Sequence, residues 1–443
     1  MFVVQPDKMS VAPQAEVAGL CVGNSRLIFA VCCAFGGPLL HLANIESGVM
    51  SLTGLSAAGK TTAMKAAASV YGRPSYMQRW RSTANALESI AVQHSDLCLV
   101  LDEIGQLDPR EAGDVAYLLA NGMEKGRATR NGLARRRRTW RVLVLSSGEI
   151  SLPDLMAEGG KRTRAGQEVR FLDIPIDAGA SMGGLEALHG HDGPGALAEA
   201  VTKAGAAFYG TAGRTWLEWL CTHHADVCGR LHDLVERHRA EMVPESAAAQ
   251  VRRAGNRFAL VAAAGELATE AGITGWARGE AARGVRACFN AWLAARGHLD
   301  NGEDAAMLRQ VRQFLELHSE GRFTWWHRAA DDHNPKTLNR AGFRRLLGDD
   351  GKPVKSDADH QREYGERIDA NDGERTHIDF VILREVFQRE VCRGFNCDEV
   401  AKLLQRRGHL VHEAGRLMDR QRLPGMGKAA CYHVKPSIFD DEL

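Results

Sequence analysis

The chain lacks several features that mark whole classes of protein. Its ten cysteines are scattered and form no CxxC pair, which argues against a disulfide scaffold and favours a reducing cytoplasm. It also has no uninterrupted run of about twenty apolar residues. Its most apolar stretch, residues 20–42, is broken by Asn24, Arg26, Pro38 and His41. We therefore expect a cytoplasmic protein without a membrane anchor or export signal, in which residues 20–42 form a buried helix beside a sheet.

An excess of charge of either sign is absent as well. The chain has 56 Lys and Arg against 55 Asp and Glu, a formal net charge of +1, so no global field attracts nucleic acid or a membrane. Any such attraction must come from local clusters. Internal repeats and low-complexity tracts are also absent. Four potential metal ligands lie in "CTHHADVC", residues 221–228, but their spacing matches no common zinc pattern, so an ordinary helix is expected there.

The 443 residues allow two or three domains, and hydrophobic and charged contents of 44% and 25% are ordinary for a globular protein. Alternating strand and helix patterns predict an α/β core with a largely parallel sheet and helices on both faces. The expected parts are an N-terminal helical segment (1–47), the core (48–176), a helical region (177–299), an irregular linker (300–376) and a small α+β domain (377–443). In the last part, helices at 378–392 and 398–407 followed by a basic-tipped hairpin predict a winged-helix-like domain.

The segment "GLSAAGKTT", residues 54–62, fits the phosphate-binding P-loop. Two glycines let the backbone turn tightly enough to direct N–H groups at a triphosphate, Lys60 reaches its β and γ phosphates, and Thr61 can bind Mg²⁺. A short strand precedes the loop and a helix follows it, whose N-terminal dipole favours phosphate. We expect ATP and Mg²⁺ as ligands, with a nucleotide site formed by Gly54, Ala58, Gly59, Lys60, Thr61 and Thr62.

A second motif, "LCLVLDEIGQL" at residues 97–107, is an apolar strand that ends in two acids. A strand buried on both faces would deliver Asp102 to Mg²⁺, and the adjacent Glu103 could orient and deprotonate a water molecule. The pair favours hydrolysis, since a small-molecule kinase has less use for a water-activating glutamate there. The plainer alternative is a core strand that ends in a solvated acidic turn.

A third strand, "WRVLVLSSGE" at residues 140–149, ends at two serines, and a basic segment precedes it. Residues 125–141 contain eight Lys and Arg and no acid, and "TRNGL" places Asn-Gly where a two-residue hairpin turn is favoured. A basic hairpin projecting from this core is suited to bind a phosphodiester backbone. The alternative is a solvated run of charge. The expected DNA-binding residues are Lys125, Arg127 and Arg130.

The order of these motifs, followed by "AGQEVRFLDIPI", resembles the family known as domain of unknown function 927. The resemblance extends from about residue 23 to 276 and more faintly to the C-terminus. It implies an AAA+ ATPase of phages, plasmids and integrated elements, similar to the hexameric MCM helicases. Members often carry a longer N-terminal portion, sometimes with a primase, so an N-terminal loading or DNA-contacting function is expected on another polypeptide. A replication or primase protein is the candidate partner.

Carried onto this sequence, the resemblance implies a role for each matching residue. Lys60, Thr61, Asp102 and Glu103 would bind and hydrolyse ATP, with Thr61 and Asp102 at the metal. Ser147 would be the first sensor and the segment around Arg130 a pore hairpin. Arg170 would be an arginine finger that reaches a neighbouring subunit, and Arg253 or Arg257 the second sensor. The region 177–299 would be the helical lid.

These expectations support two hypotheses of different kinds. The first is an ATP-driven DNA helicase or translocase of a mobile element, a ring, expected to be a hexamer, around one DNA strand. The second is an AAA+ switch that remodels or loads a DNA complex without processive unwinding, with a winged helix docking on duplex DNA through residues 420–428. A metabolic P-loop kinase is a third alternative, which the acid pair and the basic hairpin disfavour.

Overall fold

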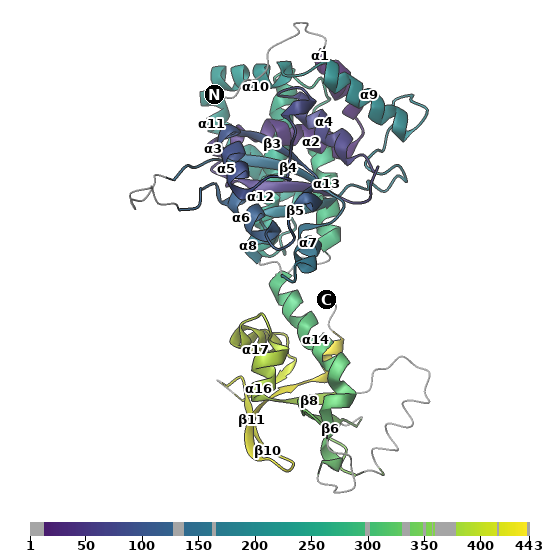
Figure 1. Cartoon of the computed structure of the whole chain (residues 1–443), viewed down its shortest axis with the longest axis vertical. Helices are drawn as coiled ribbons and strands as arrows, with labels where there is room; N and C mark the ends of the chain where they lie inside the picture. The colour runs from purple at the N-terminus through teal and green to yellow at the C-terminus, as the bar shows by residue number, and fades with distance from the viewer. Residues whose placement is uncertain are drawn as a thin grey trace. The chain divides into compact units, whose positions relative to one another are not determined.

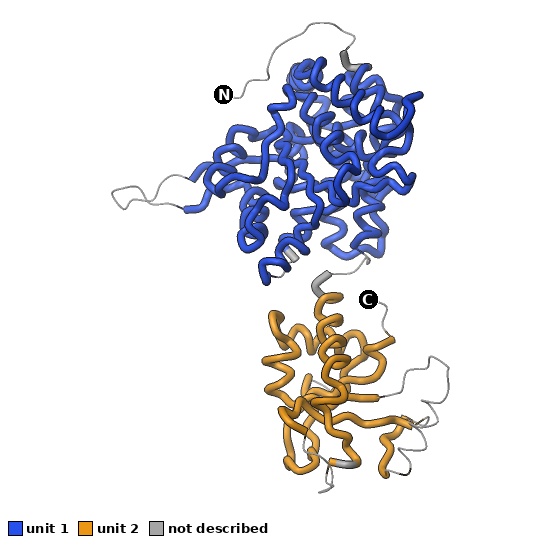
Figure 2. Tube along the Cα trace, turned by 45° about the vertical axis from the view of Figure 1, so that its right-hand side comes forward, with its two compact units in different colours: residues 1–299 blue, residues 300–443 orange. Residues whose placement is uncertain are grey.

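The computed structural model describes residues 13–126, 137–161, 165–296, 302–329, 337–348, 351–356, 358, 378–413 and 416–440. The chain divides into two compact units, residues 1–299 (unit 1) and residues 300–443 (unit 2), shown in Figure 2. Each unit has a hydrophobic core of its own. The two units are therefore described separately.

Unit 1 contains a five-stranded sheet in the order β2-β3-β4-β1-β5 (Figure 1). All neighbouring strands in it are parallel. Strands β3 and β4 are nearly continuous apolar runs because both of their faces are covered. This confirms the predicted α/β core. The strands are β1 (Gly48–Thr53), β2 (Gln78–Arg79), β3 (Leu97–Asp102), β4 (Val142–Gly148) and β5 (Phe171–Pro175).

Helices cover both faces of this sheet, since successive strand residues point to opposite sides. One face, which includes Met50 and Leu52, packs against α2 (Ser25–Gly36), α4 (Lys60–Ser69), α12 (Ala249–Glu270) and α13 (Glu280–Arg296). The other, which includes Val49, packs against α5 (Ala84–Gln93), α6 (Ala112–Asn121) and α7 (Leu152–Glu158). Every residue of α2 is buried, which confirms the helix expected within residues 20–42.

The remaining helices of unit 1 precede β1, precede β5 or follow β5 in the predicted lid. Residues 221–228 are helical, as expected, except that His223 separates the end of α10 from the start of α11. In the described ranges, no group of three or more His, Cys, Asp or Glu side chains is placed to hold a metal, and no helix is long and apolar enough to cross a membrane. These helices are α1 (Pro13–Cys21), α3 (Leu39–Leu42), α8 (Ala165–Glu168), α9 (Pro194–Ala207), α10 (Thr211–Thr222) and α11 (His224–Met242).

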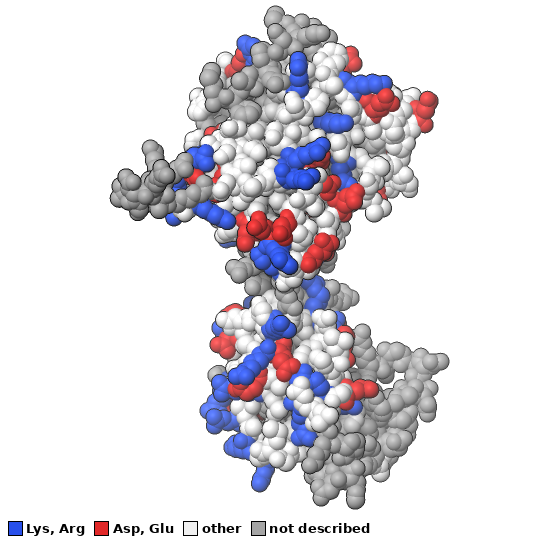
Figure 3. All heavy atoms as spheres, viewed as in Figure 1, with Lys and Arg blue, Asp and Glu red and all other residues white. Residues whose placement is uncertain are grey.

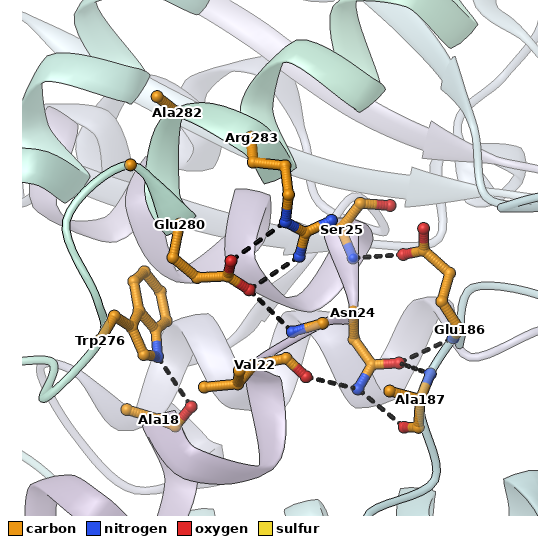
Figure 4. Close-up of polar contacts among 12 residues, drawn as sticks. Ala18, Val22, Asn24, Ser25, Glu186, Ala187, Trp276, Glu280, Ala282 and Arg283 are labelled. Carbon is orange, nitrogen blue, oxygen red and sulfur yellow. Dashed lines mark hydrogen bonds and ion pairs between the residues drawn. The ribbon is translucent and has the colours of Figure 1, made fainter.

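The N-terminal segment, from Pro13 onward, and the helices of the predicted lid form one body with the sheet. Figure 4 shows Asn24, between α1 and α2, accepting hydrogen bonds from the backbone N–H groups of Glu186 (2.7 Å) and Ala187 (3.0 Å). The N–H of Gly23 donates to Glu280 at the start of α13, 2.8 Å away. The described part of the segment 1–47 and the helices of the predicted lid, expected as separate parts, therefore share one core with the strands.

Unit 2 is a mixed sheet with helices on one side. The strand order is β10-β11-β8-β7-β6, with β9 paired to β11, and only the β6–β7 pair is parallel. Helices α14 and α17 contribute to the main core of this unit. Its elements are α14 (Gly302–Arg322), β6 (Phe323–Trp325), β7 (Gly342–Leu346), β8 (Ile378–Leu383), α16 (Arg384–Val386), a π-helical turn (Phe387–Val391), α17 (Cys397–Arg406), β9 (Leu410–Val411), β10 (Asp419–Leu423) and β11 (Gly427–Val434).

Two expectations for this region need correction. Residues 302–322 form one helix, and β6 and β7 follow it, so much of the expected linker is ordered structure of unit 2. Residues 378–383, expected to be helical, form β8. The sequence "IDFVIL" is rich in β-branched and aromatic residues, which fit a pleated strand better than a helix.

Candidate nucleotide-binding site

The predicted P-loop joins β1 to α4. Gly59 precedes the helix with φ +96°, a conformation that favours glycine, and its left-handed backbone directs the chain into α4. At Gly54, φ is +144°, and a Cβ would lie 2.7 Å from Cγ2 of Ile176. Both glycines of the motif are therefore required by backbone geometry.

The loop can receive an anion. Among the described residues, the backbone N–H groups of residues 58–61 have no hydrogen-bond acceptor, and no side chain caps the N-terminus of α4. Such free N–H groups, together with the helix dipole, favour phosphate. Lys60 is only 7% exposed, and its Nζ donates to the carbonyl oxygens of Gly54 and Leu55, each at 2.7 Å. The ammonium group thus lies inside the loop.

The other P-loop positions differ in exposure. Thr61 is exposed at the first turn of α4, while Thr62 is buried. The carbonyl of Ala58 accepts a hydrogen bond from the N–H of Gly184 at 2.9 Å. This contact was missed from the sequence. The "MGG" at 182–184 could have indicated a close approach of backbone, because a Cβ at Gly183 would lie 2.7 Å from the Ala58 oxygen.

The carboxyl ends of the strands, where the P-loop begins, bring together Asp102, Glu103 and Ser147. Leu101 of β3 is paired with Ser146, and Leu52 of β1 with Ser147, so the carboxyl ends of all three strands lie at this edge. The Ser147 hydroxyl donates to Oδ1 of Asp102 at 2.6 Å and accepts from the N–H of Glu103 at 3.1 Å. Ser147 therefore orients both acids.

Glu103 has an unusual backbone. Its φ is +62° and its ψ +79°, a region that non-glycine residues occupy at a cost of about 1–3 kcal/mol and that is common at functional sites. The neighbouring serine has a structural role, because the Ser146 hydroxyl accepts from Nε1 of the fully buried Trp80 at 2.9 Å. Of the two serines, Ser147 is the one that belongs to the site.

Arg170 lies at the opposite end of the parallel strands, where β1 and β5 begin. It precedes β5, and its carbonyl accepts from the N–H of Val49 near the start of β1. Because β1 and β5 are parallel, the length of a strand, roughly 15–20 Å, separates Arg170 from the P-loop of its own chain. Its guanidinium donates to Glu46 (3.3 Å) and lies over the Tyr117 ring, 5.5 Å from the centroid.

Arg257 does not fit the predicted role of second sensor. It is 6% exposed and donates to the carbonyl oxygens of Val169 and, at 3.3 Å, Ser47, both beside the starts of β5 and β1. Burial and the charge of Arg170 lower the pKa of Arg257 to about 10. Arg257 is thus a buried structural residue at the edge away from the P-loop. Arg253, on the same helix, is exposed.

The predicted basic hairpin is described only at its base. Met123 and Thr139 form an antiparallel bridge, and the N–H of Glu124 donates to the carbonyl of Arg138 at 2.9 Å. The Arg138 guanidinium pairs with the buried Glu124 carboxylate at 3.2 Å. Lys125 is exposed on this base. Two of the expected DNA-binding residues, Arg127 and Arg130, lie outside the described residues.

Comparison with known proteins agrees with this organisation. Residues 14–139 match the family model described as "Domain of unknown function (DUF927)", which confirms the family resemblance over this part of the chain. A search of curated protein sequences found no match. A solved structure titled "SCCmec type IV Cch - active helicase" is similar, with a TM-score of 0.66 and 18% identity, over 99% of this chain and 73% of that one. At this identity the likeness shows a shared fold.

Proposed function

We propose that this chain is an ATP-driven DNA helicase or translocase of a mobile genetic element, of the AAA+ type, that works as a ring. One observation carries the proposal. The carboxyl ends of the parallel strands carry Lys60, Asp102 and Glu103, whereas Arg170 of the same subunit lies at their amino ends. If Arg170 is an arginine finger, as the family resemblance implies, a complete site requires a neighbouring copy that presents its Arg170 to this P-loop.

The residues at the P-loop edge have complementary roles in ATP hydrolysis. Lys60 and the free N–H groups of the loop bind the β and γ phosphates. The Glu103 carboxylate accepts the proton of a water molecule that attacks the γ phosphorus, and the bond to the β–γ bridging oxygen breaks, which leaves ADP and phosphate. Ser147 keeps Asp102 and Glu103 in fixed positions.

A magnesium ion fits the oxygen donors of this edge. Thr61 is exposed at the start of α4, and Asp102 is partly buried, with its carboxylate already oriented by Ser147. Hydroxyl and carboxylate oxygens are ligands that Mg²⁺ accepts. When bound, the ion neutralises charge on the triphosphate.

The partner is proposed to be single-stranded DNA. The hairpin that starts at Met123 and Thr139 is inserted directly before β4, the strand that carries Ser147. The structurally similar helicase has the same fold as this chain. If ATP hydrolysis moves β4, the basic side chains of the hairpin would shift along the DNA backbone. We expect the ring to be a hexamer.

The test is ATP turnover with and without single-stranded DNA. We expect stimulation by DNA in the natural sequence, its loss in Arg127→Ala plus Arg130→Ala, and loss of all turnover in Glu103→Gln. Turnover that does not respond to DNA, together with no unwinding of a forked substrate, would contradict a motor and favour the remodelling or loading switch.

A further inference from the structure

The hairpin of β10 and β11 extends beyond the rest of the sheet in unit 2. β11 pairs with β8 only through residues 431–434, whereas it pairs with β10 through residues 427–431. Residues 420–430 are therefore a two-stranded ribbon. Figure 3 shows basic side chains on the side of unit 2 where Figure 1 places β10 and β11.

One face of this ribbon carries three cations. Arg422 lies directly opposite Lys428, and Arg420 lies opposite Ala430 on the same face. All three cations are exposed, and none forms an ion pair within the described part of the chain. The only acid of the two strands, Asp419, points to the other face by strand alternation. Like charges directly opposite each other destabilise a ribbon, so this pattern is favourable only beside an anion.

The tip of the ribbon is apolar. The turn is Leu423-Pro-Gly-Met-Gly427, in which the Met426 N–H donates to the Leu423 carbonyl at 3.2 Å. Gly425 and Gly427 have φ of +67° and +75°, and this geometry holds Met426 at the end of the hairpin, where it is 50% exposed. Apolar side chains such as Met and Pro, carried on basic elements, insert between base pairs of DNA and unstack them.

We propose that this ribbon binds duplex DNA, with Arg420, Arg422 and Lys428 on phosphates and Met426 inserted between base pairs as a wedge. The choice of DNA rests on the proposed function. The ribbon belongs to unit 2 and carries an apolar tip, so it is distinct from the basic hairpin of unit 1, which is proposed to bind single-stranded DNA.

The experiment uses the full chain and a 30-base-pair DNA duplex that contains 2-aminopurine. In the triple variant Arg420→Ala, Arg422→Ala, Lys428→Ala we expect duplex affinity to fall at least tenfold. We also expect the slope of log affinity against log salt to become shallower by about 2–3, because up to three phosphate contacts are lost. Met426→Ala should keep that slope but lose the increase in 2-aminopurine fluorescence that reports unstacking.

The matched control is Arg389→Ala, Lys402→Ala, Arg406→Ala, which removes three exposed cations of the same unit that are already paired with Glu385, Glu399 and Asp304. It should leave the salt slope unchanged. The ribbon variants should unfold in urea no earlier than the natural sequence, because they remove a repulsion, and their stimulation by single-stranded DNA should persist.

Several outcomes would overturn the proposal. One is a duplex affinity that is unchanged in the ribbon triple variant or that falls equally in the control variant. Another is an increase in 2-aminopurine fluorescence that survives Met426→Ala. A third is tighter binding of the natural sequence to an RNA duplex of the same length than to the DNA duplex. Failure of the proposed function is seen separately, as absent stimulation of ATP turnover by single-stranded DNA in the natural sequence.

Discussion

At the residue scale, Ser147 is the group on which the acid pair depends. Its hydroxyl holds Asp102 and the backbone of Glu103 at once. In Ser147→Ala we expect kcat for ATP to fall about tenfold to a hundredfold through misplacement of Glu103, with ATP affinity nearly unchanged. Turnover and binding of a fluorescent ATP analogue separate the two quantities.

The neighbouring serine supplies the control for this prediction. Ser146→Ala removes the partner of Trp80 and should lower the free energy of unfolding by about 1–3 kcal/mol while leaving kcat of the folded protein close to normal. If both variants lose turnover equally, or Ser147→Ala loses only ATP affinity, Ser147 does not position the acids.

Asp173 in β5 predicts a pH dependence of stability. Burial raises the pKa of its carboxyl from 3.8 to about 7, while the Leu152 N–H donates to it at 3.1 Å. The folded state therefore prefers the protonated form, so the contribution to stability is present below about pH 4 and is lost as pH rises through about 7. At most, this loss is about 4 kcal/mol, because each unit of difference in pKa is worth about 1.4 kcal/mol.

Asp173→Asn removes this ionisation and keeps an acceptor for the Leu152 N–H. We expect it to abolish most of the decline in urea midpoint between pH 5 and pH 8. The exposed Glu158→Gln, at the end of α7, should leave the decline intact. An identical decline in all three proteins would show that Asp173 is not its source.

Single residues were predictable from the sequence where a local motif fixes them. Gly54, Gly59 and Lys60 belong to one short motif, and the structure gives each a backbone or hydrogen-bond reason. Arg257 was not predictable, because burial beside two strand starts depends on how α12 packs. The sequence places Arg253 and Arg257 equally well, one helical turn apart.

At the element scale, strands covered on both faces were recognised where turn signals bound them, as in β3 and β4. β8 was assigned to a helix because a short apolar run followed by helical residues is ambiguous by periodicity alone. Helix α14 was missed because its sequence is polar overall and includes a glycine near its end. The strands that follow it, β6 and β7, are too short to be recognised from the alternation of apolar and polar residues in the sequence.

The connection between β5 and α9 is an element whose anchoring can be tested. Asn24, fully buried, accepts from two N–H groups of that connection, which also contacts Ala58 through Gly184. Asn24→Ala leaves both N–H groups without this acceptor and should lower the free energy of unfolding by roughly 2–4 kcal/mol. We also expect weaker ATP binding, since the Ala58 contact loosens.

Asn256→Ala is the control, because its side-chain oxygen is buried without a hydrogen-bond partner among the described residues. It removes an amide of the same size and should cost less. Urea unfolding and ATP titration of the full chain check both variants. Equal losses, or unchanged ATP affinity in Asn24→Ala, would show that the connection does not act on the P-loop.

At the scale of the whole molecule, the proposed site is divided between copies. Because β1 and β5 run parallel, the P-loop after β1 and Arg170 before β5 lie at opposite ends of these strands. A head-to-tail interface, in which the carboxyl end of one sheet meets the amino end of the next, is the arrangement that would join them. The motifs alone could only suggest this through family resemblance. The distance between the two edges follows from the parallel register of β1 and β5.

The division predicts complementation between inactive subunits. Arg170→Ala should bind ATP normally and lose about a thousandfold in turnover, as removal of an arginine finger does, and Glu103→Gln should also be inactive. Mixed in equal amounts, they form interfaces in which an intact Glu103 faces an intact Arg170. Random mixing makes these roughly one quarter of all interfaces, so about that fraction of activity should return. Arg230→Ala, which removes an ion-paired arginine of α11, should keep full turnover. A mixture no more active than its components, or a monomeric Arg170→Ala protein with full turnover, would refute the shared site.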